Sequence, residues 1–225
     1  MTDSCCPFRV SSDPADTLAR IVLPCYLVEF FSGMSAITRA FQGVGYTAVG
    51  FEILKDPDWM DIMTNQGMLT ALTLTLALVT PWGLNWLGIV CSSWIFMSRS
   101  QTKRSMLHPL GTEESCASVA VGNTMVARCC LLLLLTLAKR CWYVVEQPKS
   151  SLMKEHCAMV YLSELQSLPW VQEHMADTYM GAFQGDSEKP HVLLSNRYWI
   201  HALTRDRPTH MARSKNSKKI HKQTR

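Results

Sequence analysis

The chain has 225 residues, of which 48% are hydrophobic and 18% are charged, and its formal net charge is +4. The apolar fraction excludes disorder throughout the chain, and only 11 glycines and 10 prolines exclude collagen-like or Gly/Ser low-complexity structure. We therefore expect one domain of α/β size with a packed core.

The charge is distributed unevenly along the chain. Residues 205–225 hold eight basic residues and one acid, a net +7, which leaves 14 basic and 17 acidic residues, a net −3, in residues 1–204. We predict a flexible leader at 1–20, a folded domain at 21–204 and a basic disordered tail at 205–225. The tail would attract phosphate backbones, although basic termini are also common as solvated tails.

The cysteines indicate a reducing compartment. Nine cysteines are an odd number, no two have CxxC spacing, and Asp3, Arg9 and Asp13 interrupt any apolar start that could act as a signal peptide. We predict free thiols in an intracellular protein, either nuclear or cytoplasmic, with neither a disulfide framework nor a metal site.

The first elements follow a strand, turn, helix, strand order. Residues 25–31 form a short apolar run with one acid, which predicts a strand buried on both faces that ends at Ser32 and Gly33. Apolar residues recur at helical spacing from Ser35 to Val44, and residues 47–53 then predict a second strand. This order is typical of the first half of a nucleotide-binding βαβ unit.

The same alternation continues to residue 196. We predict, in chain order, a helix at 68–80, a strand at 84–90, a helix at 119–139, a strand at 142–146, a helix with a linker at 155–180 and a last strand at 191–196. Alternating strands and helices favour a mostly parallel sheet with helices on both faces.

A membrane span is the alternative for two apolar stretches. Residues 129–138 are too short, because a span needs about 20 apolar residues. Residues 62–98 lack any charge but contain Asn65, Gln66 and the turn Pro81-Trp82-Gly83, which favours a buried helix, a turn and a buried strand. A small membrane protein built on residues 62–98 remains the lesser alternative.

Chemically useful residues follow the predicted strands. Ser32 and Gly33 open a helix whose free backbone N–H groups would favour a carboxylate or phosphate, and Glu52 closes the next strand, where ribose hydroxyls are often bound. Cys91 follows the third strand and Glu146 ends the fourth. The carboxyl ends of parallel strands are where open α/β sheets bind ligands.

These motifs, in this order, resemble the cytosine-5 DNA methyltransferases. The resemblance spans about residues 28–196 and rests on Phe31-Ser32-Gly33, Glu52, Asp61-Ile62, Cys91 and Glu146. The resemblance implies a Rossmann-like class I methyltransferase fold that binds S-adenosyl-L-methionine through Phe31, Ser32, Gly33, Glu52 and Asp61. It also implies that Cys91 is the nucleophile and Glu146 the acid, with DNA, or alternatively RNA, as the acceptor.

That assignment has a chemical rationale. Cytosine C5 becomes nucleophilic once a thiolate adds at C6, and an acid at N3 stabilises the adduct. The base must leave its duplex to reach such a pocket.

The sequence also departs from the family at the catalytic motifs. Val90 stands where the family has Pro, and Gln147-Pro148 replaces Asn-Val after the acid. A catalytically degenerate homologue that binds cofactor or nucleic acid is therefore the second hypothesis.

Overall fold

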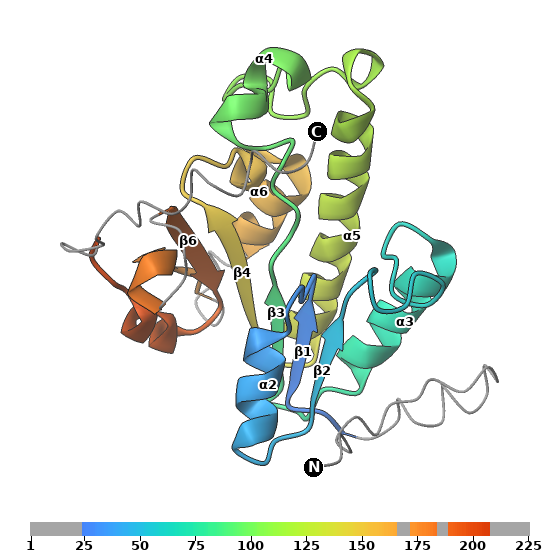
Figure 1. Cartoon of the computed structure of the whole chain (residues 1–225), viewed down its shortest axis with the longest axis vertical. Coiled ribbons are helices and arrows are strands. Elements are labelled where there is room, and N and C mark those ends of the chain that lie inside the picture. The colour runs from blue at the N-terminus through green and yellow to red at the C-terminus, as the bar shows by residue number, and fades with distance from the viewer. Residues whose placement is uncertain (1–23, 166–171, 184–188, 208–225) are drawn as a thin grey trace, which may run out of the picture.

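The computed structural model describes residues 24–165, 172–183 and 189–207, and in them one mixed sheet has the strand order β2-β1-β3-β4-β6-β5 (Figure 1). The strands are β1 (Leu27–Phe30), β2 (Ala48–Phe51), β3 (Leu84–Leu87), β4 (Trp142–Pro148), β5 (His174–Tyr179) and β6 (Pro190–Ser195). β2, β1, β3 and β4 pair in parallel, whereas β6 is antiparallel to both of its neighbours. The predicted α/β class with a mostly parallel sheet is confirmed.

Helices cover both faces of the sheet. The longer helices are α2 (Ala36–Gly43), α3 (Asn65–Leu76), α5 (Ala117–Ala138) and α6 (Cys157–Leu165). The short ones are η1 (Phe96–Ser98), α4 (Arg99–Thr102), η2 (Glu113–Ser115), η3 (Met153–Glu155), η4 (Met180–Phe183) and η5 (Tyr198–Leu203). α3, α5 and α6 pack in a row on one face, and α2 and η5 lie on the other (Figure 1).

The alternation of side chains along each strand divides the core into two. Val145 belongs to the cluster under α3, α5 and α6, whereas its neighbour Val144 belongs to the cluster on the α2 face. The first cluster is much the larger and contains fully buried Phe30, Leu132 and Leu133. The α2 face is therefore the less completely covered side of the sheet.

The leucine-rich stretch at residues 129–138 lies in helix α5. Within the described ranges it is the helix that is long and apolar enough to cross a membrane by length and composition, a test that core helices of globular proteins also pass. Its buried residues, which include Val126, Leu132 and Leu133, pack into the main core. Residues 62–98, the other apolar stretch, fold into α3, a turn and β3, as the sequence favoured.

Two strand ends differ from the predicted ones. β3 ends at Leu87 rather than residue 90, so Cys91 lies in a turn beyond the strand. β4 continues past Glu146 to Pro148, because residues 144–148 pair with β6, and Glu146 is therefore inside a strand instead of at its end.

One strand of the sheet was missed, whereas the predicted last strand at 191–196 is present as β6. Residues 155–180 contain α6 and also β5, which the sequence analysis assigned to a linker, and β6 is antiparallel. The predicted leader at 1–20 and all but residues 205–207 of the basic tail lie outside the described residues.

Candidate functional site

The turn after β1 and the end of β2 meet at one edge of the sheet. The backbone N–H of Gly33 donates to Oε2 of Glu52 at 2.7 Å, and the N–H of Leu54 donates to Oε1 at 3.3 Å. Gly33 has a positive φ of 46°, which places its N–H toward β2 in a conformation that glycine adopts readily. The structure thus brings together two of the residues assigned to cofactor binding, Gly33 and Glu52.

Lys55 adds a positive charge beside this turn. Its Nζ contacts the hydroxyls of Ser35 and of Ser32, the latter at 3.3 Å. A Cβ at Gly50 would lie 2.7 Å from Oγ of Ser35, so the lack of a side chain at residue 50 leaves room for this contact. One cation and two hydroxyls make this turn suited to a carboxylate or phosphate.

Asp61 has a local structural task. Its Oδ1 accepts from the N–H of Met63 at 2.8 Å, and its carbonyl oxygen accepts from Thr64 at the N-terminus of α3. Gly67 is packed so closely on Asp61 that an added Cβ would lie 1.9 Å from that carbonyl. Asp61 therefore fixes the start of α3, and it does not line the cavity described below.

Cys91 lies in a tight turn after β3. The N–H of Trp94 donates to the carbonyl of Cys91 at 2.9 Å, and the Cys91 side chain is partly buried. Burial raises the pKa of the Cys91 thiol, the negative charge of Glu146 raises it further, and the positive charge of Lys189 opposes the increase. The structure places Cys91 within electrostatic range of Glu146, and the thiol form predominates at neutral pH.

Glu146 faces a histidine on the neighbouring strand. Oε1 of Glu146 lies 2.9 Å from Nδ1 of His191 on β6, and both side chains are largely buried. The contact is diagonal across the antiparallel pair, because Glu146 is opposite Leu193 and His191 is opposite Pro148. The two atoms are close, but their alignment is not that of a hydrogen bond, so His191 lies beside the Glu146 carboxyl group without a bond that fixes it.

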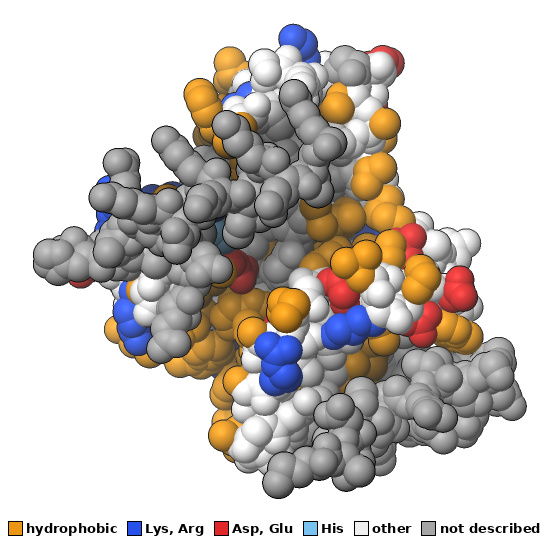
Figure 2. All heavy atoms as spheres, viewed as in Figure 1, with side chains coloured by type: hydrophobic (Ala, Val, Ile, Leu, Met, Phe, Trp, Pro, Cys, Tyr) orange, Lys and Arg blue, Asp and Glu red, His pale blue; other side chains and the backbone are white. Residues whose placement is uncertain are grey.

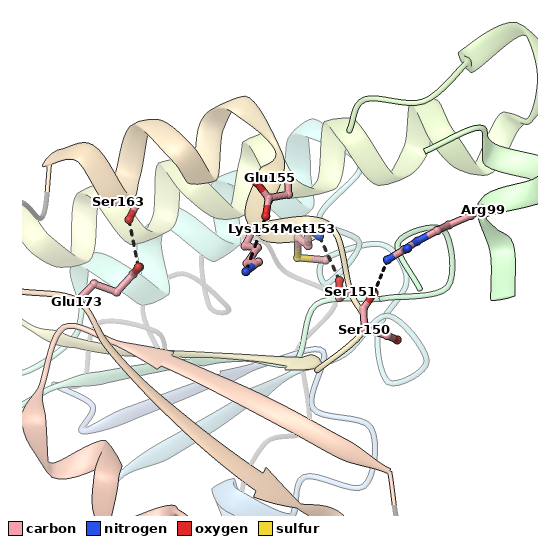
Figure 3. Close-up of polar contacts among 8 residues, drawn as sticks. All are labelled: Arg99, Ser150, Ser151, Met153, Lys154, Glu155, Ser163 and Glu173. Carbon is pink, nitrogen blue, oxygen red and sulfur yellow. Dashed lines mark hydrogen bonds and ion pairs between the residues drawn. The ribbon is translucent and has the colours of Figure 1, made fainter. Parts of the chain in front are cut away.

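The turn that carries Cys91 is joined to the segment after β4. Three hydrogen bonds make the connection: Gln147 Nε2 to Ile89 O at 2.7 Å, Leu152 N to Trp94 O at 3.0 Å, and Arg99 Nη2 to Ser150 O at 3.0 Å. Figure 3 shows Arg99 reaching toward Ser150, and in the same segment Met153 bonded to Ser151. These bonds fix the spacing between the Cys91 turn and β4.

A cavity of 910 Å³ opens on the α2 face of the sheet. Among the predicted site residues it is lined by Phe31, Ser32 and Glu146, and Gly88 also contributes from the turn after β3. Gly33, Glu52, Asp61 and Cys91 are not among its lining residues. In Figure 2, hydrophobic side chains gather in the region between α2 and the segment that contains η5.

Sequence reasoning missed Lys55 and His191. Lys55 follows Glu52 by three residues, a spacing that brings it back to the strand edge when a turn follows the strand. His191 begins the predicted last strand, but its contact with Glu146 depends on the antiparallel register, which the sequence pattern did not provide.

No protein-family model matches the chain, and a comparison with curated proteins finds no match.

Proposed function

We propose that this protein is an S-adenosyl-L-methionine-dependent methyltransferase that acts on cytosine C5 of DNA through Cys91. The observation that carries the proposal is the meeting of two pairs of residues at one edge of the sheet. Gly33 is hydrogen-bonded to Glu52 on the β1–β2 side, and Cys91 is electrostatically coupled to Glu146 on the β3–β4 side.

The strand order supports a Rossmann-like class I methyltransferase fold. The order β2-β1-β3-β4 places the first crossover on one side of β1 and the next on the other, which creates a ligand-binding switch point beside β1. A single reversed strand inserted next to the sheet edge, here β6, is typical of that fold.

The turn after β1 fits the cofactor by its chemistry. Glu52 offers a carboxylate oxygen to ribose hydroxyls, and Lys55 with Ser32 offers a cation and a hydroxyl to the carboxylate of the methionine part. When bound, S-adenosyl-L-methionine supplies an electrophilic methyl group.

The roles of the protein residues follow from the acceptor chemistry. Sγ of Cys91, as a thiolate, adds to C6 of cytosine, and a proton on Glu146 passes to N3, so C5 gains electron density for the methyl group. After methyl transfer, loss of the C5 proton to a base and expulsion of the thiolate regenerate Cys91. A base that contacts both Cys91 and Glu146 must be outside its helix.

The nucleic-acid part of the proposal rests on the charge of residues 205–225. A net +7 would give affinity for a phosphate backbone without sequence preference. Removal of residues 208–225 should weaken duplex binding and flatten its salt dependence; an unchanged salt slope would exclude the tail from DNA contact.

A second candidate function, binding without turnover, is favoured by the raised pKa of Cys91. A mostly protonated thiol is a weaker nucleophile, and the pKa of Cys116 is lowered by its hydrogen bond with Ser118. A protein of this kind would keep the cofactor turn while lacking an activated nucleophile.

Two measurements test the proposal. Calorimetry should detect S-adenosyl-L-methionine binding, and Glu52→Ala should weaken it by about 1 to 3 kcal/mol. DNA containing 5-fluorocytosine should then form a covalent adduct on Cys91, because fluorine at C5 cannot leave as the proton does. Cys91→Ser should abolish the adduct, while Cys116→Ser, which removes another accessible thiol, should leave it unchanged.

Each possible result has a clear meaning. Absence of cofactor binding would refute the methyltransferase proposal. Cofactor binding without any adduct would favour the binding protein, and an adduct on another cysteine would show that Cys91 is misassigned.

A further inference from the structure

The cavity on the α2 face has walls made mainly of large aromatic side chains. They come from the start of β3, from β4, from η5 and from α2, and are Trp82, Trp86, Trp142, Trp199 and Phe41. The ring centroids of Trp82 and Trp142 are 5.7 Å apart, and those of Trp142 and Trp199 are 6.1 Å apart. The rings thus form a continuous aromatic surface along the amino-terminal half of the sheet face.

This surface is half open to solvent. Trp82 is 61% exposed, and Trp86, Trp142 and Trp199 are partly buried. The volume of the cavity lies in the range of small-molecule pockets, and such pockets combine apolar walls with a few polar groups.

All the charge on the lining is negative. Glu29 and Glu146 line the cavity, and no Lys or Arg is among the described residues that line it. Glu29 is 6% exposed and uses Oε2 to accept from Thr38 at 2.7 Å and 2.6 Å. Two carboxyl groups facing an apolar aromatic surface favour a cation, because the ring faces and the carboxylates attract the same charge.

Arg197 already makes a cation–π contact with one of these rings, Trp142. The guanidinium of Arg197 lies 5.5 Å from the ring centroid of Trp142, within range of a cation–π contact. Arg197 itself is not among the residues that line the cavity.

From the aromatic walls and the acidic lining, we propose that this cavity is a binding site for an organic cation with a flat apolar body, such as an aryl-substituted quaternary ammonium compound. The body lies against Trp86 and Trp142, and the cationic group lies toward Glu146. The cavity shares Phe31, Ser32 and Glu146 with the proposed methyltransferase site, but binding of an organic cation requires neither turnover nor S-adenosyl-L-methionine, and neither Gly33 nor Glu52 lines the cavity.

Three probes of similar size separate the contributions. They are (2-naphthylmethyl)trimethylammonium as the cation, 2-naphthylmethanol as the neutral compound and 2-naphthylacetate as the anion. Binding to the full chain is measured by calorimetry. We expect the cation to bind about tenfold more tightly than the neutral probe and the anion to bind least, because the charged group of each probe lies toward the carboxyl group of Glu146.

Variants assign the effect to residues. Trp86→Ala should weaken all three probes, whereas Trp59→Ala, which changes a tryptophan outside the cavity, should leave their affinities unchanged. Glu146→Gln should reduce the affinity of the cation by about tenfold and leave that of the neutral probe unaltered. Because the glutamine is nearly isosteric, this second variant tests the proposal even if Trp86→Ala does not fold.

Several results would overturn the proposal. Equal affinity for the cation and the anion would exclude electrostatic selection, and unchanged cation binding in folded Trp86→Ala would place the site elsewhere. A dimer in sedimentation whose dissociation is needed before any probe binds would identify the cavity as an interface between copies. Failure to bind S-adenosyl-L-methionine in a separate titration would affect only the proposed methyltransferase function.

Discussion

The connection between the Cys91 turn and β4 depends on Gln147. This side chain is 4% exposed; its Nε2 donates to Ile89 O at 2.7 Å, and its Oε1 accepts from Ser151 Oγ at 3.0 Å. Gln147→Leu keeps most of the volume and removes both bonds, together with the local bond from Nε2 to Glu146 O at 2.8 Å. An unpaired buried carbonyl at Ile89 costs about 1 to 3 kcal/mol and the bond from Ser151 contributes about 1 kcal/mol, so the free energy of unfolding should fall by about 2 to 4 kcal/mol.

Urea unfolding measures this loss, and two variants serve as controls. Gln66→Leu makes the same chemical change at an exposed position of α3 and should alter stability by less than about 0.5 kcal/mol. Ser151→Ala removes one of the bonds of Gln147 together with the bond that Ser151 Oγ accepts from Met153 N, and its effect should not add fully to that of Gln147→Leu, because the two variants share the Gln147–Ser151 bond. A Gln147→Leu protein as stable as the wild type would refute the view that Gln147 joins the two turns.

Three further predictions concern packing and titration. Gly67→Ala should lower stability by about 1 to 3 kcal/mol in urea unfolding, because its Cβ would overlap a backbone carbonyl at 1.9 Å; a neutral effect would mean that the turn before α3 relaxes freely. Iodoacetamide at pH 7 should label Cys116 faster than Cys91. Glu146→Gln should shift the labelling midpoint of Cys91 to lower pH, because the variant removes a negative charge near the thiol. An upward shift would contradict the effect of Glu146 on the pKa of Cys91. Burial lowers the pKa of His156 below 6.5, so the unfolded chain binds the proton more tightly than the folded one. The free energy of unfolding should therefore fall as pH decreases through about 6.5. His156→Asn should flatten this dependence in urea midpoints measured from pH 5 to 8.

The sequence predicted the first half of the fold well because its strands are buried on both faces. All four residues of β1 are buried, so an apolar run with a single acid, Glu29, identified the strand without knowledge of its neighbours. The helices α3 and α5 were also recognisable, because their length and apolar composition exceed what a strand can hold.

β5 was missed because it is an edge strand with a mixed pattern. Ala176 and Thr178 are buried, whereas Met175 is exposed, so half of the residues of β5 have the exposure that is typical of a loop. The direction of β6 could have been inferred from chain length. Fewer than a dozen residues separate β5 from β6, too few for the crossover that a parallel pair needs.

The structure brings some of the predicted site residues close together, while their roles stay a prediction. Because β3 and β4 are neighbours, Cys91 and Glu146 lie within electrostatic range of each other. The aromatic cavity could not be predicted, because Trp86, Trp142 and Trp199 come from three distant segments and meet only when β4 pairs with β3 and η5 folds over the sheet. Periodicity identifies which face of an element is apolar, but it does not identify which face stays uncovered.

The charge coupling between Cys91 and Glu146 bears on the proposed chemistry. Burial is the main cause of the raised pKa of the Cys91 thiol, and the negative charge of Glu146 adds to it. The proposed addition to cytosine needs a thiolate at Cys91 and a proton on Glu146, a state in which the pair carries one negative charge. In that state the opposition from Glu146 is absent, and the positive charge of Lys189 favours the thiolate. Burial and the charge of Glu146 keep Cys91 in the thiol form, so the thiolate that this mechanism needs must form as cytosine binds, and Glu146→Gln should increase thiol reactivity at Cys91 while removing the group that turnover requires.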